Sequence, residues 1–165
     1  MGEHGEEEER LGFTYDVFIS FRGEDTRNNF IGHLRRELDG KGIKSFNDDK
    51  NMRTGESLPP DLSKAIEESK IFIVVFSENY ASSRWCLDEL VRIIERSKMK
   101  EKKQLVYPVF YHVDPSDIRH ERNSFGKHMK AHENDIAKES QMQAWRSALS
   151  QAVDFPGKHI TTGYV

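Results

Sequence analysis

The sequence has little of what a secreted or membrane-spanning protein needs. Cys86 is the one cysteine among 165 residues, so no disulfide can form within the chain, and no Asn-x-Ser/Thr glycosylation site occurs. The longest apolar run is IFIVVF, residues 71–76, which is far too short to span a bilayer. The first residues have neither the basic start nor the apolar stretch of a signal peptide. We therefore expect an intracellular protein, in the cytoplasm or also in the nucleus, without a membrane partner.

The common motifs for phosphate and metal binding are also absent. The chain has no GxxxxGK[ST], GxGxxG, CxxC or HExxH. His128 and His132 have the i, i+4 spacing of helical metal ligands, but no third ligand is evident, so we expect a solvated helix face and no metal site. A two-component receiver is excluded as well, because Ser77–Glu78 follow the third expected strand where a phospho-accepting aspartate is required.

The charge of the chain is unevenly distributed. Residues 1–10 hold five glutamates and one arginine, a net charge of −4, so the remaining residues carry +1 of the total of −3. An acidic run without apolar periodicity does not order itself, which predicts a disordered leader over residues 1–11. The near-neutral remainder makes nucleic acid an unlikely partner, since phosphate-binding domains carry a basic excess.

Apolar runs and helical periodicities alternate along residues 12–155, which we expect to form one domain. Four such alternations imply right-handed crossovers and a parallel sheet covered on both faces, so the predicted fold is a flavodoxin-like, three-layer α/β domain with four to five strands. We expect residues 156–165 to be an extension or the start of a linker, with Gly157–Val165 as the candidate for a fifth strand. The expected strands are Tyr15–Phe21, Ile43–Phe46, Lys70–Phe76 and Gln104–Val113, and the expected helices follow Asp25 and cover Leu62–Ile66, Ser82–Ile94, Ser124–Ala137 and Gln141–Val153.

The stretch SSRWCLDELVRII, residues 82–94, holds the candidate site. Trp85 and Glu89 lie one helical turn apart, so their side chains are neighbours. In a doubly wound sheet, ligands bind outside the carboxyl ends of the strands, where this helix begins. An aromatic plate beside a carboxylate suits a planar cationic ring attached to a sugar. The alternative is a half-buried tryptophan beside a solvated carboxylate. Cys86 is expected to be a buried, inert thiol.

Five stretches that follow one another along the chain closely resemble the TIR domains of plant intracellular immune receptors, the TIR-type nucleotide-binding leucine-rich-repeat disease resistance proteins. They are YDVFISFRGEDTR, GIKSFNDD, IFIVVFSENYASSRWCLDEL, PVFYHVDPSDIR and WRSAL, and the likeness runs from about Tyr15 to Val153. The resemblance implies the same flavodoxin-like fold. It also implies an NAD⁺ nucleosidase that cleaves NAD⁺, with NADP⁺ as an alternative, between nicotinamide and ribose, that needs no cofactor, and that is active when assembled.

The resemblance also assigns roles to residues of the candidate site. Glu89 of CLDEL would be the catalytic glutamate, and Trp85 of SRWCL would contact the bound nucleotide. The other implied substrate-binding residues are Arg22 and Gly23 of FRGED, Ser83, and Arg53 in the mobile flap Asp48–Gly55.

Family members assemble with themselves and with other TIR domains, and the resemblance places one contact surface on the first and last helices and a second one near Asn123. The implied contact residues are Gly32, His33, Asn123 and Trp145. Gly32 stands where the family often has serine, and Asn123 stands where it has glycine, so we expect weak self-association. Asparagine tolerates positive φ, so the backbone at Asn123 is expected to be kept. Two alternatives stay open: a non-catalytic adaptor that only assembles with other TIR domains, and a nuclease that uses Cys86.

Overall fold

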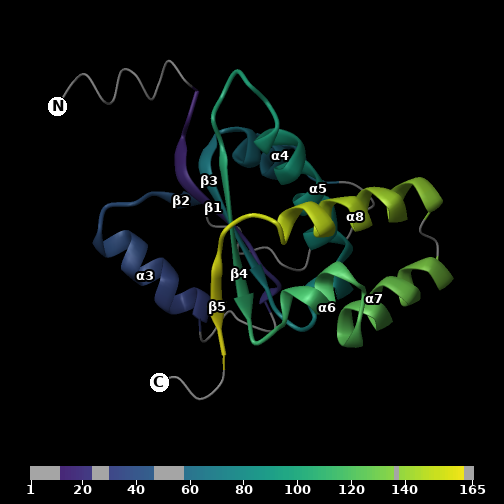
Figure 1. The fold of residues 1–165 in the computed structure, drawn as a ribbon. Helices are drawn as coiled ribbons and strands as arrows, with labels where there is room; N and C mark the ends of the chain where they lie inside the picture. Colours follow the sequence, from purple (N-terminus) through teal and green to yellow (C-terminus); the bar gives the residue numbers. More distant parts are fainter. Residues whose placement is uncertain (1–11, 24–29, 47–57, 136–137, 162–165) are drawn as a thin grey trace.

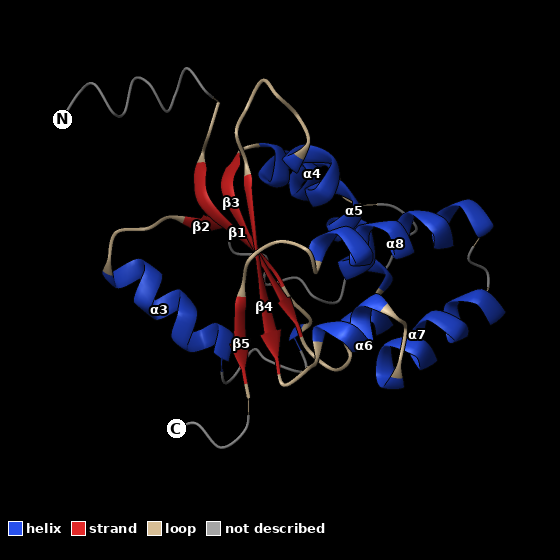
Figure 2. Ribbon diagram, viewed as in Figure 1, coloured by secondary structure: helices blue, strands red, loops and turns tan. Residues whose placement is uncertain are grey.

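The protein is built on a five-stranded sheet in which all the strands are parallel. The structure, a computed structural model, describes residues 12–23, 30–46, 58–135 and 138–161. The strand order is β2-β1-β3-β4-β5, which is the flavodoxin-like order predicted from the sequence (Figures 1 and 2). The strands are β1 (Tyr15–Ser20), β2 (Ser45–Phe46), β3 (Ser69–Phe76), β4 (Leu105–Tyr111) and β5 (Lys158–Ile160).

Helices cover the two faces of the sheet unequally. Among the described helices, α3 alone lies on one face of the sheet, and the others gather on the opposite face (Figure 1). A 3₁₀ turn, η2, connects β3 to α5. The bounds are α3 (Gly32–Gly40), α4 (Pro60–Glu67), η2 (Tyr80–Ser82), α5 (Arg84–Ser97), α6 (Pro115–Arg119), α7 (Asn123–Asn134) and α8 (Glu139–Ala152).

Side-chain alternation along the strands divides the core into two clusters. Phe18 on β1 faces α4, α5 and α8, whereas Val17 and Ile19 face α3. The same alternation holds on β4, where Val106 joins the larger cluster. The cluster under α4, α5 and α8 is the larger of the two, so the position of α5 is fixed by extensive apolar burial.

The face under α3 is incompletely covered by the described residues. Leu105 and Tyr107 on β4 lie on this face by alternation and keep 51% and 42% of their surface exposed. They flank Val106, which is buried on the other side of the same strand. No helix in the described ranges is long and apolar enough to cross a bilayer.

The expected carboxyl-terminal extension contains part of the sheet. β5 pairs with β4 through the register Val109↔Lys158, Phe110↔His159 and Tyr111↔Ile160, so the domain continues at least to Ile160 and the boundary at residue 155 was too early. The candidate fifth strand is therefore confirmed, although it has only three residues. Short polar strands carry little periodicity, which explains why its extent was unclear from the sequence.

Gly157 allows β5 to approach β4 closely. A Cβ at this position would lie 2.1 Å from the carbonyl oxygen of Pro108, which is an impossible contact. Gly40, the last residue of α3, has no heavy atom within 4 Å of an added Cβ and no positive φ.

We predict that Gly157→Ala destabilises the domain by about 1–3 kcal/mol, because backbone atoms of β4 or β5 must move to relieve the clash. Gly40→Ala is the matched control and should leave stability unchanged or raise it by a few tenths of a kcal/mol to about 1 kcal/mol. Urea unfolding followed by circular dichroism measures both. Equal midpoints for the two variants would contradict the close approach.

Candidate functional site

The site is assembled at the carboxyl ends of β1 and β3. β1 ends at Ser20, and β3 ends at Phe76 and is followed by η2 and the first turn of α5. Because the two strands are parallel neighbours, these segments meet at one edge of the sheet. Ser20 alternates with Ile19 and therefore points toward α5, as Phe18 does.

Glu89 lies on the inward side of α5. It shares the spacing of Cys86, Leu90 and Ile93, which are all buried, and its own exposed fraction is only 9%. The Ser20 hydroxyl donates a hydrogen bond to Glu89 Oε1 at 3.0 Å. The alternative interpretation of Glu89 as a solvated helix carboxylate is thus wrong. A carboxylate kept inside an otherwise apolar stripe is costly for folding, which favours a functional role.

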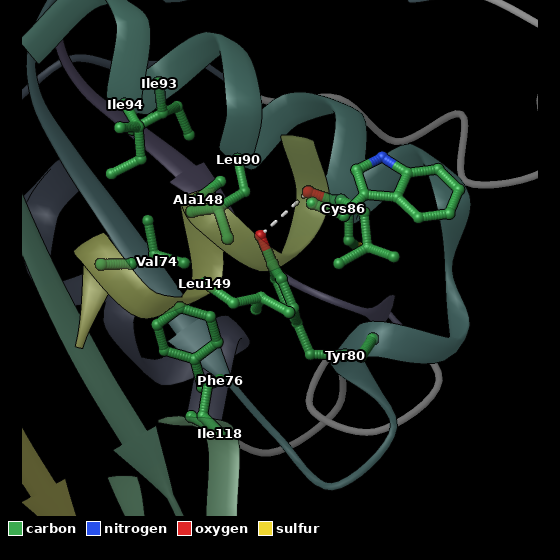
Figure 3. Close-up of a cluster of buried hydrophobic side chains, with 14 of the residues drawn as sticks. Val74, Phe76, Tyr80, Cys86, Leu90, Ile93, Ile94, Ile118, Ala148 and Leu149 are labelled. Atoms are coloured by element: carbon green, nitrogen blue, oxygen red, sulfur yellow. Dashed lines mark hydrogen bonds between the residues drawn. The ribbon is translucent and has the colours of Figure 1, made fainter. Parts of the chain in front are cut away.

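Tyr80 extends this contact into the core. Its hydroxyl lies 2.8 Å from Ser20 Oγ and donates to the Cys86 carbonyl oxygen at 3.1 Å, the bond that is dashed in Figure 3. The ring is fully buried and packs edge-on against Phe76 at 5.0 Å between centroids. Burial, and secondarily the nearby Cys86 and Glu89, raise the pKa of the Tyr80 hydroxyl well above its ordinary value, so it remains protonated.

The first turn of α5 carries three further predicted residues. Ser83 is the N-cap: its hydroxyl accepts from the Cys86 backbone N–H at 3.2 Å, so it has a structural task besides any contact with a ligand. Trp85 is half-buried and packs against the larger core cluster, one turn before Glu89. The Cys86 thiol is buried and lies 3.5 Å from the Phe21 carbonyl oxygen, as the inert interpretation expects.

The structure describes only some of the other residues that were predicted to bind substrate. Arg22 and Gly23 lie just past the end of β1, after Phe21, and are half-buried, so they lie at the same edge of the sheet as Ser20. Arg53 and the flap Asp48–Gly55 lie outside the described residues.

The predicted contact residues fall at separate places. Gly32 and His33 open α3, where His33 is exposed. Asn123, also exposed, opens α7 with φ 54°, which confirms that asparagine keeps a left-handed backbone there, and its amide donates to Asp117 at 3.1 Å. Trp145 does not lie on a surface: its ring is 1% exposed inside the core, because the apolar stripe of α8 turns toward the sheet and α5.

Two histidines attach α7 to the segment before α5. His132 Nε2 lies 2.8 Å from the Ala81 carbonyl oxygen, and His128 Nε2 lies 2.9 Å from Asn79 Oδ1. His132 is buried, so the expected solvated face is wrong for this residue. The described residues hold no group of three or more metal-ligating side chains, and the spacing of these histidines serves packing against η2.

Asp88 connects α5 to α8. Its Oδ1 accepts a hydrogen bond from Trp145 Nε1 at 2.9 Å. Burial raises the pKa of the Asp88 carboxyl above its ordinary value, and the Trp145 bond and the charge of Arg84 offset this only in part. The ionised form of the Asp88 carboxylate therefore slightly destabilises the folded state, at the position next to Glu89.

Ser20 and Tyr80 were not anticipated as parts of the site. One signal was available, since Ser20 is a polar residue at the end of the otherwise apolar run VFIS of a buried strand. No local pattern indicated Tyr80, because its role depends on how η2 folds back onto β1, sixty residues earlier in the chain.

The geometry defines an α/β domain with a carboxylate site at the carboxyl edge of a doubly wound sheet, and sequence comparison identifies its family. The TIR domain model matches residues 14–164, so the chain belongs to the TIR domain family. Disease resistance protein RUN1 of Vitis rotundifolia is 50% identical over 152 residues, which cover 92% of this chain and 11% of that protein. TMV resistance protein N of Nicotiana glutinosa is 51% identical over 146 residues, covering 88% and 13%.

A solved structure supports the same assignment. The TIR domains of the activated Roq1 resistosome, which directly recognises the pathogen effector XopQ, superpose with a TM-score of 0.81 at 44% identity, over 92% of this chain and 90% of that one. The predicted resemblance and fold are confirmed. The chain spans only about a tenth of the length of its curated relatives.

We predict that Asp88→Asn raises stability at neutral pH and that Asp88→Ala lowers it. An asparagine side chain at this position keeps an oxygen for Trp145 Nε1 but carries no charge, whereas alanine leaves the indole N–H unpaired at a cost of about 1–3 kcal/mol. Because the folded-state pKa of Asp88 is raised, its protonated form favours folding. The advantage of Asp88→Asn should therefore be absent at low pH and grow as the pH rises through the raised pKa.

Urea unfolding at a series of pH values measures this difference. A constant difference between Asp88→Asn and wild type across the acidic range would contradict a raised pKa for Asp88.

Proposed function

We propose that this chain is a plant immune-signalling domain that hydrolyses NAD⁺ to nicotinamide and ADP-ribose-type products, with Glu89 as the catalytic residue. The observation that supports the proposal most directly is the buried Glu89 carboxylate. It is held by Ser20 at the ligand-binding edge of the sheet, one turn from a half-exposed tryptophan.

One carboxylate is chemically sufficient for this reaction. Glycoside hydrolysis ordinarily needs two carboxylic groups, because the leaving oxygen must be protonated. The nicotinamide of NAD⁺ is a pyridinium that departs as a neutral molecule, so no general acid is required. Glu89 then has one task, to stabilise the positive charge that develops on the ribose while its carbon–nitrogen bond breaks and water replaces nicotinamide.

The partly apolar surroundings of Glu89 suit that task. An anion fixed in a poorly hydrated site interacts more strongly with a developing cation than one in bulk water. Trp85, half-buried beside it, offers an aromatic face for the nucleotide, and Arg22 at the end of β1 offers a positive charge for a phosphate.

Signalling and assembly enter through the relatives. RUN1 and protein N are named as resistance proteins, and the Roq1 TIR domains belong to a resistosome. By analogy, we infer that this domain acts in disease resistance and associates with its own copies or with other TIR domains. In the assembly, the flap Asp48–Gly55 with its Arg53 would complete the pocket. In this proposal the reaction requires no metal and no bound cofactor.

We predict that Glu89→Gln abolishes NAD⁺ cleavage, with a loss of about 100- to 1,000-fold or more, because the amide keeps the shape and the acceptor for Ser20 but removes the charge. Glu95→Gln is the matched control, since Glu95 lies on the same helix but is exposed beside Arg92. The measurement is chromatography of NAD⁺ and nicotinamide, with the protein concentrated on a crowding surface.

The outcomes separate the candidate functions. Nicotinamide release by wild type and Glu95→Gln, but not by Glu89→Gln, supports the enzyme. Equal release by folded Glu89→Gln removes Glu89 from the mechanism. No release by any of the folded proteins leaves the non-catalytic adaptor as the better hypothesis.

Self-association should be weak in isolation. Asn123 adds an exposed side chain where the resemblance expects glycine, and Gly32 lacks the hydroxyl of serine. We predict that the isolated domain is mostly monomeric at roughly micromolar concentration, because a weak complex is dissociated in that range. Multi-angle light scattering checks this, and a stable tetramer would overturn it.

A further inference from the structure

A chain of hydrogen-bonding groups runs from the core to the Glu89 carboxylate. The Cys86 carbonyl oxygen, the Tyr80 hydroxyl, the Ser20 hydroxyl and Glu89 Oε1 are linked in this order by contacts of 3.1, 2.8 and 3.0 Å. Ser20 comes from β1, Tyr80 from η2, and Glu89 from α5. Three segments that are distant in the sequence therefore meet at one carboxylate.

The number of hydroxyl protons determines which group donates at each of these three contacts. Ser20 and Tyr80 supply one hydroxyl proton each for three contacts. When Glu89 is ionised, Ser20 donates to it, and Ser20 Oγ can then only accept from Tyr80. The Tyr80 proton is therefore shared between Ser20 Oγ and the Cys86 carbonyl. The Ser20 proton points toward the carboxylate, and the part of the Tyr80 donation that goes to Ser20 Oγ strengthens the bond from Ser20 to Glu89.

We propose that Ser20 and Tyr80 are positioning residues that orient Glu89 and hold it as an anion, an inference that rests on the proposed NAD⁺ cleavage. Neither residue needs to touch the substrate. Ser20 fixes one carboxylate oxygen, and Tyr80 fixes the direction of the Ser20 hydroxyl.

Burial keeps this arrangement from exchanging its partners with water. Ser20 and Tyr80 are both fully buried, and Glu89 is nearly so. The raised pKa of Tyr80 keeps its proton available for donation. Tyr80 faces Glu89 from η2, the Cys86 thiol lies one turn earlier on α5, and the charged Arg22 follows Ser20 past the end of β1.

Ser69 shows what a serine with a purely structural role looks like in this fold. It is also fully buried, on β3 beside β1, but at the opposite end of the sheet, paired with Tyr15. Its hydroxyl donates to the Ala65 carbonyl oxygen at 2.6 Å, within its own connection from α4. Ser69→Ala is thus a matched control for Ser20→Ala, with the same substitution, the same burial and the same sheet.

The first measurement does not depend on activity. The carboxyl carbon of Glu89 is followed by NMR through an acid titration in wild type, Ser20→Ala, Tyr80→Phe and Ser69→Ala. Loss of a hydrogen-bond donor destabilises the ionised form of Glu89. The titration midpoint of Glu89 should therefore move to higher pH, by about one unit in Ser20→Ala and by less in Tyr80→Phe. Ser69→Ala should titrate like wild type. Tyr80→Phe keeps the buried ring and its contact with Phe76, which provides a folded variant even if Ser20→Ala is unstable.

The second measurement is the pH dependence of nicotinamide release. We expect Ser20→Ala to lower kcat by roughly 10- to 100-fold with little change in KM, the loss of one hydrogen bond to a charged group in the transition state. The acidic limb of its profile should move to higher pH together with the NMR midpoint. A structural defect alone would lower the rate at all pH values and would not move the limb.

The outcomes for positioning and for NAD⁺ cleavage are distinguishable. If wild type cleaves NAD⁺ and Ser20→Ala and Tyr80→Phe match Ser69→Ala in both measurements, positioning by Ser20 and Tyr80 is overturned and the enzyme stands. If the Glu89 midpoint moves in both variants while wild type releases no nicotinamide, the hydrogen-bond chain holds the carboxylate as proposed and the assigned reaction fails.

Discussion

The packing of α5 on the sheet is the interaction on which the rest of the site depends. Leu87, Leu90 and Ile93 are fully buried against the larger core cluster, and each contributes about 1.5–3 kcal/mol of hydrophobic stabilisation. This burial fixes the rotation of the helix about its axis. With the rotation fixed, Glu89 has to face β1, where Ser20 is the group that meets it. The carboxylate is thus held in place by apolar contacts that take no part in any chemistry.

Two further helices, α7 and α8, hold the start of α5 in place. α8 holds Asp88 through the Trp145 indole, and α7 holds the segment before the helix through His132 and the Ala81 carbonyl. His132 and Trp145 also lie side by side, with ring centroids 5.1 Å apart. Trp145 and His132 therefore form one buried unit. It joins α8 to α5 through Asp88 and α7 to η2 through Ala81. Residues well away from Glu89 in sequence accordingly contribute to its placement.

Periodicity and turn residues were enough to predict most of the fold, whereas the polar contacts of the site were not predictable. The strand IFIVVF and the helix that begins at Ser83 follow from apolar runs and capping, which are local properties. Glu89 was recognised as a candidate from its spacing to Trp85, but its burial was not, because hydropathy assigns a helix carboxylate to solvent. Trp145 was misplaced because a motif does not tell which face of a helix is covered. The Tyr80–Ser20 contact depends on tertiary proximity alone.

The edges of the sheet bear on how copies of this domain can meet. β2 has two residues and β5 has three, and these are the outer strands of the described sheet. Strands this short offer few unpaired backbone groups to an incoming strand, a protection against edge-to-edge aggregation. As far as the described residues are concerned, growth by strand addition is therefore disfavoured. Association between copies is left to side chains on helices and loops, where single substitutions can tune its strength without disturbing the sheet.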